Sequence, residues 1–181
     1  MPTLYVDDPD QGIAPATSHP AFVAVAPASF YDQGEYFSPF GNDSGHDALR
    51  ELEDWYVADG RDDDLPAFVD ELMSSWDFGV PADVWMAGRE TVHARLRGGS
   101  LDEVELSAEA QGRLAIVLGQ FKIRGGLTPA ARTHGGGVVE VLLALADRAR
   151  ETSPHWPHAD RNLAAIEAAA VVVDKAPALS D

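Results

Sequence analysis

Apolar residues recur at helical spacing along most of this chain, and this pattern limits its possible folds more than any other feature. The clearest case is Leu114, Val117, Leu118 and Phe121, which follow one another at i, i+3, i+4 and i+7. Residues with this spacing lie on one face of an α-helix. Glycine and proline separate this stretch from others of the same kind. The pattern therefore predicts a helical protein.

The expected helices follow from where each apolar stretch begins and ends. Asp43 or Ser44 can cap the first long helix, and Gly60 can end it. Proline in a first turn and glycine after a last turn mark the others. The helices expected on this basis cover residues 43–59, 64–76, 82–97, 107–124, 138–150 and 159–174. The fold class is therefore all-α, an irregular bundle of six or seven helices with a loop-rich N-terminal segment.

The remaining segments are expected to be non-helical or are ambiguous. Residues 1–17 are polar and aperiodic, and we expect a flexible arm there. Residues 21–26 and 113–123, each taken alone, fit either a helix or a strand. The aromatic-rich residues 30–42 are expected to form a loop packed on the core. Gly135–Gly137 predicts a flexible break before a helix.

Length and composition fit one globular domain. The chain has 181 residues, of which 45% are apolar, and no long linker divides it. We therefore expect a single helical domain over residues 1–181. Within it, residues 18–97 form motif-bearing helices and residues 107–175 form the core helices.

The charge balance excludes several classes of function. Lys and Arg number 13 against 30 Asp and Glu, so the net charge is −17. Nucleic-acid binders and proteins that dock on anionic lipid need basic surface instead. The chain has no cysteine, which excludes disulfides, thiolate metal sites and cysteine nucleophiles. No apolar run reaches the roughly 20 residues of a membrane span, and Met1–Asp8 lacks the features of a signal peptide. We therefore expect a cytoplasmic protein.

The most distinctive motif is Ser-Pro-Phe-Gly-Asn-Asp-Ser-Gly, which covers residues 38–45. Pro39 fixes one φ angle, and Gly41 can adopt a positive φ. Asn42 and Asp43 can accept hydrogen bonds from backbone N–H groups where the next helix begins. The motif therefore predicts a tight turn that leads into a helix.

This motif, with His19-Pro20 before it and Asp47-Ala48-Leu49 after it, resembles the small bacterial YfeS-like family. The resemblance covers residues 18–72, roughly a third of the chain. It implies no catalytic residues. Some similar domains are encoded near polymorphic toxins, so the resemblance implies an immunity-protein-like role.

The motif has two interpretations, and the sequence leaves both open. In the structural one, Phe40 fills the core and the polar residues support the start of the helix. In the functional one, Asp43, His46 and Asp47 form a polar site, because residues four apart share a helix face. A hard cation or a basic residue of a partner could bind there. The candidate interaction residues are Phe40, Asn42, Asp43, His46 and Asp47.

Histidines and carboxylates offer a second candidate site. His155 and His158 lie close to Asp160, and imidazole and carboxylate groups bind zinc and iron. The prolines around them predict a rigid connector with exposed histidines as the alternative. A third histidine would have to come from elsewhere in the chain, namely His19, His93 or His134.

Two functions from different classes remain. No motif of nucleophilic catalysis or phosphate binding is present, and we expect no cofactor. The preferred function is a non-enzymatic protein-binding module that uses acidic surface around residues 43–64 against a basic protein partner. The alternative is a small metal-binding protein or a metal-assisted hydrolase. The sequence leaves the oligomeric state open.

Overall fold

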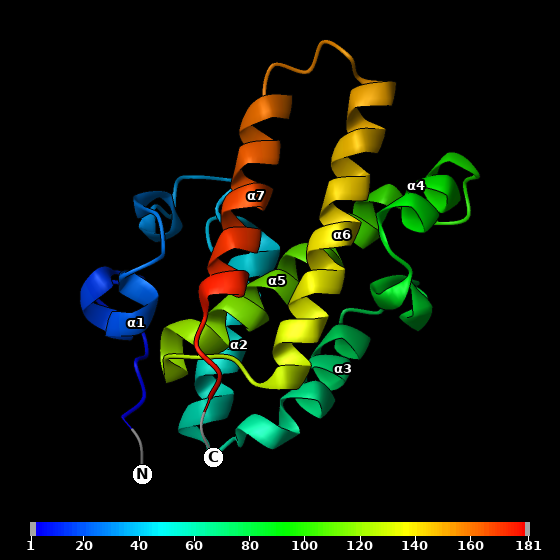
Figure 1. Cartoon of the computed structure of the whole chain (residues 1–181). Helices are drawn as coiled ribbons and strands as arrows, with labels where there is room; N and C mark the ends of the chain where they lie inside the picture. The colour runs from blue at the N-terminus through cyan, green and yellow to red at the C-terminus, as the bar shows by residue number, and fades with distance from the viewer. Residues whose placement is uncertain (1–2, 180–181) are drawn as a thin grey trace.

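The computed structural model describes residues 3–179 and shows a bundle of helices (Figure 1). Within this range the chain forms α-helices, short 3-10 segments and loops, and no β-strand. The prediction of an all-α bundle is confirmed. No helix in the described range is both long and apolar enough to cross a membrane. The helices are α1 (Pro20–Val23), α2 (Asp43–Val57), α3 (Leu65–Ser75), α4 (Arg89–Arg97), α5 (Glu103–Arg124), α6 (Pro129–Thr152) and α7 (Ala159–Lys175).

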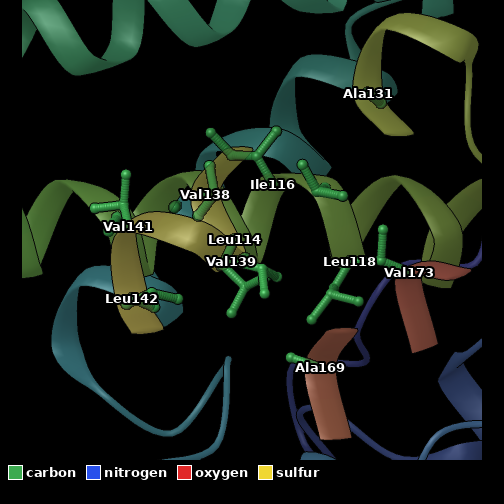
Figure 2. Packing of buried hydrophobic residues seen from close by; sticks show 14 of the residues in the cluster. Leu114, Ile116, Leu118, Ala131, Val138, Val139, Val141, Leu142, Ala169 and Val173 are labelled. Carbon is green, nitrogen blue, oxygen red and sulfur yellow. The ribbon is translucent and has the colours of Figure 1, made fainter. Parts of the chain in front are cut away.

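Helix α5 lies at the centre of the bundle. It crosses behind the neighbouring helices α6 and α7, and α2 packs along it (Figure 1). Every residue from Gly112 to Ile123 is buried, so the helix is enclosed on all sides rather than along one stripe. Figure 2 shows Ile116 and Leu118 pointing to opposite sides of α5, with Leu118 directed toward α7. Because apolar residues of this helix lie on every face, they do not form a single helical stripe in the sequence. Residues 113–123, taken alone, therefore also fit a strand.

Aromatic rings attach the loop before α2 to the core, as predicted for residues 30–42. The rings of Phe22 and Phe121 meet edge to face with centroids 5.3 Å apart. Phe30 and Phe40 pack beside them, also edge to face, at 6.5 Å. All four side chains are buried, and edge-to-face pairs of this kind add to the stabilisation from burial. The cluster therefore holds the distinctive motif against α5.

The N-terminal segment, expected to be a flexible arm over residues 1–17, is held by the core at Tyr5 and Asp7, and residues 1–2 lie outside the described range. Its described part, from Thr3 onward, lies against α5. The Nζ atom of Lys122 lies 2.8 Å from Asp7 and 2.7 Å from Glu53, and it donates to the Tyr5 carbonyl oxygen at 3.3 Å. The Lys122 residue is 0% exposed. A buried lysine on the central helix therefore ties the start of the chain to the core.

Helix α6 begins at Pro129 rather than at residue 138, and α4 and α5 also differ from the expected bounds. Helix α5 begins at Glu103 rather than at residue 107, because the Asp102 carboxylate accepts hydrogen bonds from first-turn N–H groups at 2.9 and 3.0 Å. Such an N-cap satisfies donors that have no partner inside the helix. The helix expected over residues 82–97 is two elements, a 3-10 segment (Ala82–Met86) and α4. Gly88 separates them with a φ of 73°.

The three consecutive glycines lie inside α6, so the predicted flexible break at Gly135–Gly137 is wrong. A Cβ atom on Gly137 would lie 2.0 Å from the Trp85 carbonyl oxygen. A Cβ atom on Gly135 would lie 2.9 Å from a methyl group of Val117. The glycines therefore allow neighbouring segments to approach α6 closely, and tertiary packing outweighs their weak helix propensity.

Candidate functional site

An open groove of about 410 Å³ lies where the N-termini of α2 and α5 meet the loop before α2. We call it the α2/α5 groove. Its two sides come from segments far apart in the sequence, and the packing of α2 against α5 brings them together. The residues that line it are Tyr36, Asn42, Asp43, Ser44, Glu103, Val104, Ser107, Ala108 and Gln111.

The distinctive motif builds the α2 side of the groove. The Asn42 side chain is buried, accepts a hydrogen bond from the Gly45 N–H at 2.8 Å and donates to the Ser38 carbonyl oxygen at 3.0 Å. Asn42, and not Asp43 or Ser44, is therefore the N-cap of α2. A Cβ atom on Gly45 would lie 2.0 Å from a backbone oxygen of the preceding loop, so only glycine fits there. The motif thus folds the loop tightly onto the helix start.

The first two turns of α5 build the other side. Val104, Ser107, Ala108 and Gln111 follow one another at i, i+3, i+4 and i+7, so they share one helix face. Val104 is 78% exposed. Tyr36, contributed by the loop, is 61% exposed. Two exposed apolar side chains therefore line the same groove, although exposed apolar residues on a protein surface are usually scattered singly.

The charge around the groove is negative. Asp43 lies in the first turn of α2, and Asp102, Glu103 and Glu105 surround the start of α5. Each helix N-terminus carries a partial positive charge of about half a unit, which offsets only part of these carboxylates. Arg148 binds Glu103 at 2.9 Å, but no lysine or arginine of the described chain lines the groove itself. The groove therefore suits a basic group better than an acidic one.

The five candidate interaction residues do not form one site. Phe40 lies in the core, and the Asn42 side chain is occupied as the N-cap of α2. Asp43 is exposed at the α2/α5 groove, whereas His46 is exposed and lines a separate pocket of about 210 Å³. Asp47 is exposed and lines neither. Asn42 and Asp43 thus share the α2/α5 groove with residues of α5, whereas Phe40 and His46 share the other pocket with residues of the N-terminal segment.

Tyr36, Val104 and the rest of the α5 face are not among the site residues predicted from the sequence. The spacing of Val104 with Ser107 and Gln111 is a usable signal, but it matters only if the helix begins at Glu103. A helix that begins at residue 107, as the sequence predicts, leaves Val104 outside it. No pattern in the sequence shows that Tyr36 lies opposite Val104.

The histidines are dispersed rather than gathered. His155 is exposed in the connector between α6 and α7, and the His158 ring packs 6.1 Å from that of Phe37. Asp160 pairs with Arg150 at 3.0 Å. Across residues 3–179 no three histidine or carboxylate side chains are placed together to hold a metal ion. The three histidines considered as a further ligand have separate neighbours: Ala21 N–H for His19, Glu151 for His93 and Arg113 for His134.

No protein-family model, curated protein or solved structure matches this chain. The resemblance to the YfeS-like family therefore stays a prediction. The function has to be inferred from the geometry and charge of the groove.

Replacing Asn42 with alanine should lower the free energy of unfolding by about 1–2 kcal/mol. The change removes the N-cap of α2 and leaves the Gly45 N–H without its acceptor. Asp47→Ala, on the exposed face of the same helix, should change stability by less than about 0.5 kcal/mol. Urea denaturation measures both. Equal effects of the two substitutions would contradict the assignment of Asn42 as the cap.

Proposed function

We propose that this protein is a non-enzymatic binding module that holds a basic, partly apolar segment of a partner protein in the α2/α5 groove. The observation that carries the proposal is the pairing of two exposed apolar side chains, Tyr36 and Val104, inside a groove bordered by carboxylates. Apolar surface rimmed by polar residues is typical of protein interaction sites.

The two kinds of surface contribute differently to binding. The net charge of −17 attracts a basic partner and raises the rate at which the two molecules meet. Tyr36 and Val104 supply the contact area that holds the partner once it has docked. Neutralisation of a basic toxin, the role that the sequence resemblance implies, is one form of this function.

Two short peptides that stand in for the partner segment test the proposal. One peptide alternates lysine and leucine, and its control alternates glutamate and leucine. In ¹H–¹⁵N NMR titrations the basic peptide should shift the backbone signals of Tyr36, Val104 and Gln111, and added salt should weaken the effect. The acidic peptide should leave these signals unchanged. Shifts spread evenly over the acidic surface would contradict a specific groove.

Matched substitutions separate groove binding from general charge attraction. Val104→Ser should weaken binding of the basic peptide about fivefold, because it removes apolar contact area without altering any charge. Val57→Ser is the control, since Val57 is 63% exposed at the other end of α2, outside the groove. Val57→Ser should leave the affinity unchanged. Equal effects of the two substitutions would overturn the proposal.

A further inference from the structure

A second, smaller pocket lies between α3, α5 and α6, separate from the α2/α5 groove. Its volume is about 130 Å³, and its walls are largely apolar, with Val69, Ile116, Val117 and Ala131 among the lining residues. For comparison of size, an engineered cavity of ~150 Å³ lined by leucine, isoleucine and phenylalanine binds benzene. The pocket therefore has room for one molecule of about that size.

Charged and polar groups meet the pocket at one place. Arg113 is only 7% exposed and lines the pocket. Its Nε donates to Glu109 at 2.8 Å, and its guanidinium carbon lies 4.5 Å from the centroid of the Trp85 ring. These contacts hold the guanidinium in place before any ligand arrives. A guanidinium has five N–H donors, so donors remain for a further acceptor.

His134 is the second polar group in the pocket wall. Its Nε2 lies 3.3 Å from a terminal nitrogen of Arg113. Burial, together with the charge of Arg113, lowers the pKa of His134 to about 4, so the imidazole is neutral at neutral pH. Because a guanidinium can only donate, Nε2 must accept and the ring proton sits on Nδ1. With Nε2 already occupied by Arg113, the guanidinium is the hydrogen-bond donor at this end of the pocket.

The charges around these donors favour a neutral ligand. Glu109 compensates the charge of Arg113, and the exposed Asp70, which also lines the pocket, adds a negative charge. An anion would meet net negative surroundings, whereas a neutral carbonyl could accept a hydrogen bond from Arg113 without that repulsion. We infer that this pocket binds a small neutral molecule of about benzene size, with an apolar body and one hydrogen-bond-accepting oxygen.

Three probes with the same branched skeleton test the inference: 3-methyl-2-butanone, isobutyrate and 2,3-dimethylbutane. They differ only in presenting a ketone, a carboxylate or no acceptor. In NMR titrations of the full chain, the ketone should shift the signals of Val69, Val117, Ala131 and His134. Its affinity should exceed that of either other probe about tenfold, because a hydrogen bond from a charged donor is among the stronger ones. Tighter binding of the carboxylate, or equal binding of ketone and alkane, would overturn the inference.

Filling the pocket gives the matched control. Ala131→Leu should abolish the shifts caused by the ketone, and Ala131→Val should reduce them if the larger side chain prevents folding. Gly136→Ala lies on the same helix, where an added Cβ meets nothing within 4 Å, and should leave the ketone affinity unchanged. Ketone shifts as large as those of the wild-type protein in a folded Ala131 variant would place the molecule elsewhere and contradict the assignment.

Discussion

Replacing Lys122 with methionine should lower the free energy of unfolding by about 3–5 kcal/mol, a large share of the stability of a domain of this size. The substitution keeps the length of the side chain but removes the charge that compensates Asp7 and Glu53. Both carboxylates are almost fully buried. Burial already raises the pKa of Glu53, and the neighbouring ammonium opposes that rise. Without the Lys122 ammonium group, the carboxylates of Asp7 and Glu53 would share a buried site with no cation.

The chain supplies its own control for this experiment. Lys175 is the only other lysine, and it is exposed in the last turn of α7. Lys175→Met should change stability by less than about 0.5 kcal/mol in the same urea denaturation. Adding Asp7→Asn and Glu53→Gln to Lys122→Met should recover part of the lost stability, because the uncompensated charges are then removed as well. A loss below about 1 kcal/mol for Lys122→Met alone would contradict this account of the cluster.

Gly137→Ala should lower the free energy of unfolding by about 1–3 kcal/mol, although alanine is the better helix former. The reason is steric. The added Cβ would lie 2.0 Å from the Trp85 carbonyl oxygen, which belongs to backbone and cannot rotate away. α6 would have to separate from the 3-10 segment before α4. Thermal or urea denaturation measures the effect directly.

The adjacent glycine gives the opposite expectation. Gly136 lies in the same helix, but a Cβ there meets nothing within 4 Å. Gly136→Ala should therefore raise stability by about 0.5–1 kcal/mol, because alanine loses less conformational freedom on folding. Two neighbouring substitutions of the same kind should thus act with opposite signs. A gain in stability from both would support the flexible break that the glycine pattern predicts.

The helical content of the bundle is predictable because it depends on local spacing. Apolar periodicity, prolines and glycines lie within a few residues of the feature they indicate, as at Pro20 or Gly125. The glycines of α6 mislead because their role depends on Trp85, which is distant in sequence. The position of the N-terminal segment is also hard to predict, because its contacts are with residues distant in sequence. Nothing in the sequence near Asp7 shows that its partner is Lys122.

In the candidate site, too, only the features that depend on neighbouring residues could be predicted from the sequence. The motif around Asn42 is recognisable because a cap acts on the backbone three residues away. Its exposed neighbour Asp43 is found with it. The groove itself needs Tyr36 and Val104 on facing sides, and only the packing of the loop and α2 against α5 places them there. Surface hollows of this kind have no local sequence signal.

The buried tie between Lys122 and the start of the chain has a consequence for synthesis on the ribosome. Tyr5 is translated 117 residues before the lysine that binds its carbonyl oxygen. Until Lys122 has been translated, Tyr5 and Asp7 lack their binding partner in the bundle. This segment therefore reaches its final position only after α5 has been made, and premature termination before α5 would leave it without a partner.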